Sequence, residues 1–194
     1  TLFALYITVF VCAAWRLLDR RQESRMSDVV SSTFTAVYVP FLASFVVLML
    51  AAWRDPWVFV VFELMVIAND TGGWAAGVLF GKHPMAPALS PKKSWEGFAG
   101  SALTAVGVGC VGLWLLGAAW WWGIVAGVSI AFVGTMGDLT ESLIKRESGL
   151  KDMSQILPGH GGVLDRVDAL LMSAPVAYFI FAWALPGISW ESSH

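Results

Sequence analysis

The chain has 194 residues, of which 57% are hydrophobic and only 13% are charged. Together with a mean hydropathy of +0.69, this places it outside the soluble globular class, in which about a quarter of the residues are charged. The composition therefore predicts an integral membrane protein. A net charge of −2, with no basic run interleaved with aromatic residues, gives no indication of nucleic-acid binding.

Six apolar stretches are long enough to cross a bilayer, which takes roughly 18 to 25 residues in a helix. They lie at about 1–18, 29–53, 57–80, 97–117, 119–137 and 168–187. The predicted fold class is all-α, a polytopic bundle of about six transmembrane helices that forms a single catalytic domain over residues 1–194. Because an apolar stretch begins directly at Thr1, we expect further spans to precede it in a longer protein.

Lysine and arginine residues predict how this bundle is oriented. Eleven of the twelve lie in three loops on one side of a six-span arrangement, and Arg54 alone lies on the other side. By the positive-inside rule, these three loops face the cytoplasm. An aromatic belt is predicted at the opposite interface, formed by Trp53, Trp57, Trp114, Trp120, Trp121, Trp122, Trp183 and Trp190.

The stretch 57–80 contains polar residues within an apolar run. Asn69 and Asp70 interrupt it, and Glu63 lies seven residues before Asp70 on the same helical face. Burying a charged side chain at the centre of a bilayer costs at least ~2.5–3.5 kcal/mol. We therefore expect Asp70 to face a water-filled or protein-lined cavity.

The loop that follows carries Lys82, Lys92 and Lys93 before Ser94 leads into the next apolar stretch. A hydroxyl residue followed by Glu96 and Gly97 suits a helix start, where free backbone N–H groups and lysines can bind phosphate. Alternatively, the lysines serve only as topology signals.

The longest polar interval, residues 137–168, combines six carboxylates with four cations. These are Asp138, Glu141, Glu147, Asp152, Asp165 and Asp168, with Lys145, Arg146, Lys151 and Arg166. On a helix, Lys145 shares a face with Asp138, and Ser142 and Arg146 lie beside them, so that Lys145 and Arg146 can reach one anion. The alternative is a solvated loop with weak surface ion pairs.

A glycine-rich turn, Pro158-Gly159-His160-Gly161-Gly162, divides this interval and leads into an apolar run near Val163. Glycines admit close approach of the backbone, so the helix start after the turn suits an anion. Asp165 and Asp168 follow at i and i+3, and with Asp138 they can converge as the oxygen ligands that Mg²⁺ prefers.

From Ser142 onward, SLIKRESGLKDMSQILPGHGGVLDRVD resembles the signature of the phosphatidate cytidylyltransferase family, also called CDP-diacylglycerol synthases. The shared positions are Ser142, Lys145, Arg146, Lys151, Asp152, Pro158, His160, Gly161, Gly162, Asp165, Arg166 and Asp168. The segments Asn69-Asp70-Thr71-Gly72, Phe80-Gly81-Lys82 and SPKKSWEG from Ser90 are also similar, with Ser94 in a place where Thr is expected. The resemblance covers roughly residues 63–185, and residues 1–60 carry no motif that adds to it.

This resemblance implies transfer of the cytidylyl group of CTP to phosphatidic acid, giving CDP-diacylglycerol and pyrophosphate. It implies an integral protein of a bacterial-type plasma membrane, surrounded by lipids, with its active site facing the cytoplasm, and it is compatible with a homodimer. Mg²⁺ is the implied cofactor, with a second metal or a monovalent cation beside it.

Roles for individual residues follow from the resemblance. Those expected in catalysis are Lys145, Arg146, Lys151, Arg166 and Asp152. Those expected to bind substrate are Asn69, Asp70, Lys82, Lys92, Lys93, Ser94, Ser142, His160, Gly161 and Gly162. Those expected to hold metal are Asp138, Asp165 and Asp168. An ion- or proton-coupled transporter using Asp70 and Glu63 is the alternative function, but the charged residues gather at the membrane boundary, which favours the enzyme.

Overall fold

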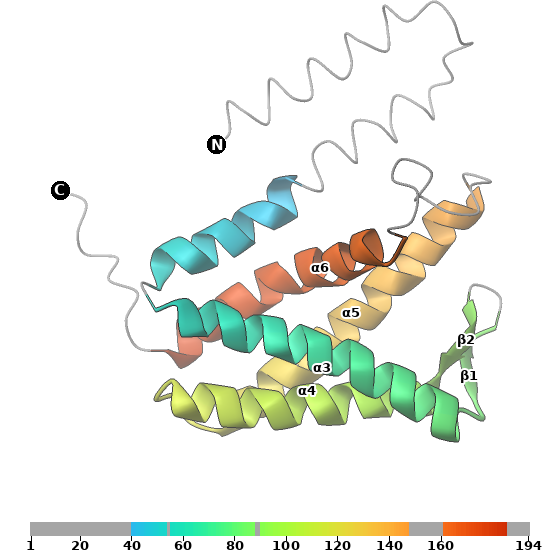
Figure 1. Cartoon of the computed structure of the whole chain (residues 1–194), viewed down its shortest axis with the longest axis horizontal. Helices are drawn as coiled ribbons and strands as arrows, with labels where there is room; N and C mark the ends of the chain where they lie inside the picture. The colour runs from blue at the N-terminus through green and yellow to red at the C-terminus, as the bar shows by residue number, and fades with distance from the viewer. Residues whose placement is uncertain (1–39, 54, 88–89, 148–160, 186–194) are drawn as a thin grey trace, which may run out of the picture. The chain divides into compact units, whose positions relative to one another are not determined.

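The computed structural model describes residues 40–53, 55–87, 90–147 and 161–185 (Figure 1). The chain divides into two units, residues 1–45 and 46–194. The described part of the first unit is the beginning of the apolar helix Pro40–Ala52, in which the rings of Phe41 and Phe45 meet edge to face with centroids 5.5 Å apart. The candidate site lies entirely in the second unit.

Four helices and a small hairpin make up most of the second unit. The helices are α3 (Pro56–Phe80), α4 (Trp95–Leu115), α5 (Trp121–Glu147) and α6 (Gly161–Ala184). Three helical segments are long and apolar enough to cross a membrane, namely Pro56–Phe80, Trp95–Leu115 and Trp121–Leu139. The prediction of a helical protein with helices able to span a membrane is therefore confirmed for these described segments. The stretches predicted at 29–53 and 168–187 contain the shorter apolar helices Pro40–Ala52 and Leu170–Ala184, and the stretch at 1–18 lies outside the described residues, so the six spans stay a prediction.

Local chemistry explains where the first two of these helices begin. Asp55 caps α3, because its Oδ1 accepts a hydrogen bond from the backbone N–H of Trp57 at 3.0 Å, and Pro56 fits the first helical position. Ser94 caps α4 in the same way, accepting from the N–H of Gly97 at 3.1 Å. The helix start that the sequence predicts at Ser94 is thus confirmed.

Glycines let the helices pack closely. A Cβ added at Gly123 of α5 would lie 2.2 Å from the backbone nitrogen of Cys110 in α4, and one at Gly127 would lie 2.5 Å from that of Val106. Only glycine admits so close an approach of two backbones, the arrangement typical of membrane helices. The largest fully buried side chains include Phe62, Met65, Leu113, Ile130 and Phe181.

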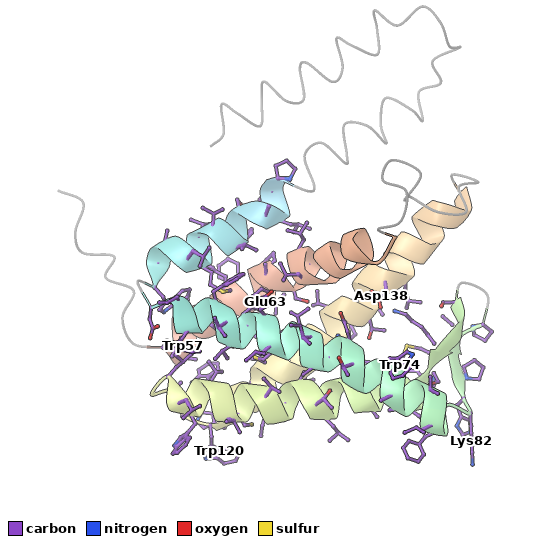
Figure 2. The ribbon with its side chains drawn as sticks, viewed as in Figure 1. Trp57, Glu63, Trp74, Lys82, Trp120 and Asp138 are labelled. Carbon is purple, nitrogen blue, oxygen red and sulfur yellow. The ribbon has the colours of Figure 1, made fainter. Side chains whose placement is uncertain are left out.

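The helices present different residues at their two ends. Trp57 and Trp120 lie together at one end, and Lys82 lies at the other, beside the hairpin (Figure 2). Trp57 and Trp120 thus lie as the predicted aromatic belt requires, whereas exposed Trp95 lies beside the hairpin, and Trp190 of the predicted belt lies outside the described residues. Trp53 departs from the predicted belt, because its side chain is buried and its ring packs edge to face on Tyr178, with centroids 5.6 Å apart.

A two-stranded antiparallel hairpin lies between α3 and α4. Strand β1 (Pro84–Ala86) pairs with β2 (Ser90–Ser94), placing Pro84 opposite Ser94 and Ala86 opposite Ser90. The sequence predicts only a loop here, because prolines interrupt both strands and leave no clear alternation. The all-α prediction is therefore incomplete at the point where the hairpin carries Lys93 toward the helices.

Candidate active site

A cavity of about 340 Å³ lies where α3, α4 and α5 meet the hairpin. Its lining combines polar and aromatic side chains with glycines: Asn69, Asp70, Gly73, Trp74, Gly77, Met85, Lys93, Ser94, Gly97, Phe98, Ser101, Thr135 and Asp138. Four predicted substrate-binding residues and one predicted metal ligand thus share one cavity, although they are far apart in the sequence.

An ion pair between Lys93 and Asp138 joins the hairpin to α5. The Nζ of Lys93 donates to Oδ2 of Asp138, 45 residues later in the chain. The Lys93 side chain is 24% exposed and that of Asp138 is 44% exposed. Both charged groups are therefore reachable from the cavity while they hold each other in place.

The start of α4 adds positive potential to the same cavity. Ser94 and Gly97, which form the helix cap, both line it. The N–H of Gly97 is already bonded to Ser94, so the contribution of this helix start is its dipole, which favours anions near the first turn. With Lys93 next to the cap in sequence, this side of the cavity suits a phosphate group.

Helix α3 contributes Asn69 and Asp70 to the wall of the cavity, and the helix is unbroken at these residues. Asn69 Nδ2 donates to Asp70 Oδ1 at 3.2 Å, and the hydroxyl of Ser101 in α4 donates to the backbone oxygen of Asn69 at 2.8 Å. The Asn69 side chain is buried, and its Oδ1 has no partner among the described residues. Asp70 lines the cavity, as expected for a carboxylate within an apolar helix, while its part in substrate binding stays a prediction.

A second cavity, of about 550 Å³, lies along α3 and shares Asp70 and Trp74 with the first. Its remaining lining residues are Glu63, Val66, Ile67, Thr71 and Leu170. Glu63 is exposed rather than enclosed in the helix packing. Both cavities combine polar and apolar walls, and they meet at Asp70 and Trp74.

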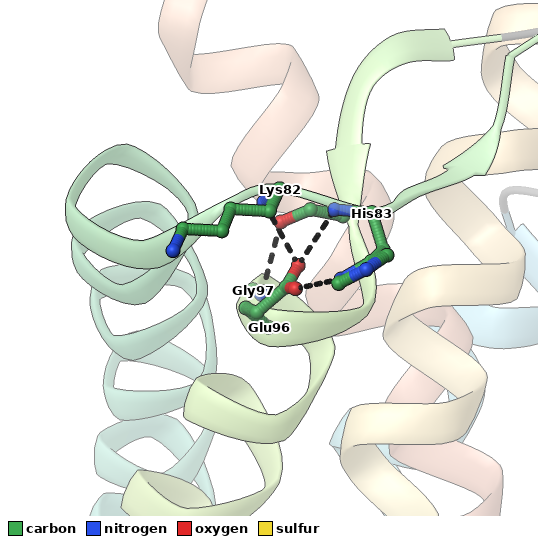
Figure 3. Close-up of polar contacts among 5 residues, drawn as sticks. Lys82, His83, Glu96 and Gly97 are labelled. Carbon is green, nitrogen blue, oxygen red and sulfur yellow. Dashed lines mark hydrogen bonds and ion pairs between the residues drawn. The ribbon is translucent and has the colours of Figure 1, made fainter.

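Lys82, predicted to bind substrate, is not among the described residues that line either cavity. Its backbone N–H instead donates to Glu96 Oε2 at 3.2 Å, and its side chain extends away from that carboxylate (Figure 3). The structure therefore places Lys82 at the root of the hairpin, where its backbone N–H binds the Glu96 carboxylate.

Several cavity residues are not among those that the sequence predicts. Thr135 lies three residues before Asp138 on α5, and Ser101 lies on α4 seven residues after its cap Ser94. Helical spacing from a predicted site residue is the signal that would have found them. Trp74, four residues after Asp70, follows the same rule.

The remaining predicted residues lie where only the backbone is described, or outside the described residues. Ser142, Lys145 and Arg146 belong to α5, and Gly161, Gly162, Asp165, Arg166 and Asp168 belong to α6. Lys92 belongs to β2, and Lys151, Asp152 and His160 lie outside the described residues. Helix α6 begins at Gly161, slightly before the start predicted near Val163.

Helices α5 and α6 pack against each other close to Asp138. A Cβ added at Gly137 would lie 3.2 Å from Cγ of Met172, and the two helices run in opposite directions (Figure 1). Asp168 and Asp165 precede Met172 by four and seven residues on α6. Among the residues whose side chains are described, no three His, Cys, Asp or Glu side chains gather as a metal site.

Comparison with known proteins identifies the family. The model of the cytidylyltransferase family matches residues 1–184. The chain belongs to the cytidylyltransferase family. This match extends to the first 60 residues, where the sequence alone offers no recognisable motif.

Curated relatives carry the name phosphatidate cytidylyltransferase. That of Mycobacterium bovis is 43% identical over 186 residues, covering 89% of this chain and 60% of the relative. That of Mycobacterium leprae is 40% identical over 187 residues, covering 88% of this chain and 60% of the relative. That of Haemophilus influenzae is 40% identical over 155 residues, covering 74% of this chain and 54% of the relative. The chain thus spans between 54% and 60% of the length of these cytidylyltransferases.

The family membership confirms the resemblance seen in the signature segment. The transporter hypothesis for Asp70 and Glu63 gains no support from these comparisons. Asp70 instead shares a cavity with Lys93 and Asp138 in a chain of a nucleotidyl-transferring family.

Proposed function

We propose that the protein transfers the cytidylyl group of CTP to phosphatidic acid, giving CDP-diacylglycerol and pyrophosphate. The observation that carries this proposal is the cavity that joins Lys93, the α4 helix start and Asp138 in a membrane-type member of the cytidylyltransferase family. The printed names of the relatives support the same activity.

The reaction requires two polyanions to meet. A phosphate oxygen of phosphatidic acid forms a bond to the α-phosphorus of CTP, while the bond from that phosphorus to the bridging oxygen breaks and its electron pair leaves with pyrophosphate. The nucleophile is already an anion, so no strong base is needed, and the main demand is positioning and charge stabilisation. Cations and helix N-termini are the groups that meet this demand.

Within the cavity, Lys93 would contact phosphate oxygens, and the N-terminal dipole of α4 would favour their negative charge. Asn69 and Asp70 would complete the nucleotide or headgroup pocket from α3. Lys145, Arg146, Lys151 and Arg166 would add cations, with Ser142, Asp152 and His160-Gly161-Gly162 completing the signature segment. Lys92 would join Lys93 on the hairpin.

The donors present suit Mg²⁺. Asp138 and Asp70 bring carboxylate oxygens to one cavity, and such hard ligands match this ion. We propose that Asp138, Asp165 and Asp168 hold Mg²⁺, with a second metal or a monovalent cation nearby. Bound Mg²⁺ would supply positive charge against the phosphate oxygens. The Lys93 side chain, partly exposed beside Asp138, would then be available to phosphate.

The same proposal sets the site in a membrane. Positive loops would place the hairpin end of the helices at the cytoplasmic face of a bacterial-type plasma membrane, where a lipid headgroup meets a soluble nucleotide. Membrane lipids would surround the exposed apolar faces, and a homodimer is compatible with this arrangement.

A panel of substrates tests the proposed function. Purified protein in detergent with Mg²⁺ is expected to form a lipid product from CTP and phosphatidic acid. The matched controls replace phosphatidic acid by diacylglycerol, which lacks the attacking phosphate, or CTP by CDP, which lacks the γ-phosphate. Lipid product of equal yield with diacylglycerol, or none with the complete pair, would contradict the proposal.

A further inference from the structure

The carboxylate of Glu96 closes the root of the hairpin (Figure 3). Its Oε2 accepts hydrogen bonds from the backbone N–H groups of Lys82 and His83, each at 3.2 Å, and its Oε1 lies 2.5 Å from Nδ1 of the His83 ring. Three contacts from one side chain therefore tie the segment after α3 to the first turn of α4.

Backbone contacts continue this connection into the hairpin. The N–H of Trp95 donates to the backbone oxygen of His83 at 3.0 Å, and Pro84 pairs with Ser94 at the start of the two strands. Lys93 is the residue directly before Ser94 in β2. The position of the Lys93 ammonium is thus set within a few residues of the Glu96 contacts.

The hairpin is small and depends on its contacts with the helices. Its strands contain three and five residues, and two short strands alone are at best marginally stable in water. The described contacts that restrain it include the Glu96 cluster and the Trp95–His83 backbone hydrogen bond at its root, together with the Lys93–Asp138 ion pair. Loss of the contacts at the root would let Lys93 shift from its place in the cavity.

We infer that Glu96 is a positioning residue for cytidylyl transfer: it holds the hairpin root so that Lys93 stays in the cavity, paired with Asp138. This rests on the proposed function. In the described part of the chain Glu96 is not among the residues that line the cavity, so its effect passes through Lys93. A displacement of about 1 Å in such a group can lower a rate by about 10²-fold.

A double-variant cycle with Lys93 tests this inference. Glu96→Ala is expected to lower kcat/KM for CTP by about 10- to 100-fold. In a Lys93→Ala background the same substitution is expected to change kcat/KM by less than about twofold, because the group that Glu96 positions is already gone. Glu96→Gln keeps an oxygen that accepts from both backbone N–H groups and is expected to retain most of the activity.

The control is Asp55→Ala. Asp55 also accepts a backbone N–H at a helix start, but it caps α3, whereas the hairpin follows the other end of that helix. Its removal is expected to leave kcat/KM for CTP unchanged. Equal losses from Glu96→Ala with and without Lys93, accompanied by a matching fall in thermal stability, would overturn the inference and leave Glu96 a general structural residue.

Hydrogen–deuterium exchange gives a readout that needs no activity. Glu96→Ala is expected to raise exchange at residues 82–94 while exchange within α3 and α5 stays as in the parent protein, and Asp55→Ala is expected to leave residues 82–94 unchanged. Faster exchange in Glu96→Ala, with no cytidylyl transfer by the parent protein, would refute the proposed function and retain the restraint of the hairpin root by Glu96. Unchanged exchange at residues 82–94 in Glu96→Ala would refute the restraint of the hairpin root by Glu96.

Discussion

Replacing Lys93 by methionine separates its part in phosphate binding from its part in folding. The substitution keeps an unbranched side chain of similar length and removes the positive charge. In the absence of substrate the change removes the ion pair with Asp138. In the presence of CTP it removes the cation that we propose contacts phosphate.

The exposure of the pair limits its contribution to stability. Two unit charges 4 Å apart attract by about 1 kcal/mol in water and about 4 kcal/mol at an effective dielectric constant of 20. Because Lys93 is 24% exposed and Asp138 is 44% exposed, solvent screening and the cost of ordering both side chains reduce the net value. We expect Lys93→Met to lower the free energy of unfolding by about 1 kcal/mol.

The expected effect on activity is larger. A hydrogen bond to a charged group contributes about 1.5–3 kcal/mol, and each 1.36 kcal/mol corresponds to about tenfold in kcat/KM. Lys93→Met is therefore expected to lower kcat/KM for CTP by about 10- to 150-fold. Steady-state rates in detergent measure this loss, and thermal unfolding of the same preparations measures stability.

Lys82→Met is the matched control, because Lys82 is an exposed lysine near the same hairpin but outside the described lining of the cavity. It is expected to change kcat/KM by less than about twofold. A Lys93→Met variant that keeps its parental kcat/KM, or that loses activity only in proportion to stability, would refute the phosphate-binding role. Equal losses in both lysine variants would indicate a general effect of loop charge.

Three further predictions address packing, metal binding and orientation. Gly123→Ala places a Cβ 2.2 Å from the backbone of Cys110 and is expected to destabilise the folded protein by about 1–3 kcal/mol or more. Gly107→Ala, with no described atom within 4 Å of its Cβ, is the control, and equal thermal stability of the two variants would contradict this packing. Asp165→Asn is expected to lower turnover by roughly 10²–10³-fold across a Mg²⁺ titration. Its unfolding temperature is expected to stay the same or rise, because neutralising one of several clustered carboxylates relieves repulsion, and an unchanged Mg²⁺ requirement would remove Asp165 from the metal site. Cysteines at Ser90 and Ala119 are expected to react with membrane-impermeant reagents from the cytoplasmic and the outer side, respectively, and labelling from the same side would contradict the orientation.

Sequence patterns predict the helices well where local chemistry determines their ends. The stretch expected at 57–80 is α3, which begins at Pro56 because Asp55 supplies the cap. The start of α4 at Trp95 follows from the hydroxyl of Ser94. In both places the signal lies within a few residues, so no distant contact is needed to read it.

The hairpin and the cavity depend on contacts between distant residues. Lys93 and Asp138 are separated by 45 residues, and no local pattern indicates that they pair. Glu96 reads as an ordinary acidic residue in a helix first turn, whereas its partners are Lys82 and His83 on another segment. The burial of Trp53 could not be predicted from its sequence position either, since an amphipathic indole suits both a membrane interface and the buried place beside Tyr178.

The division of the phosphates of CTP between products tests cytidylyl transfer most directly. Protein in detergent is incubated with phosphatidic acid, Mg²⁺ and CTP that carries radioactive phosphorus at either the α- or the γ-position. Attack at the α-phosphorus predicts that the α-label enters the lipid fraction and that the γ-label appears in pyrophosphate in equal amount. A γ-label in the lipid, or an α-label that stays in water-soluble nucleotide while CTP is consumed, would contradict cytidylyl transfer.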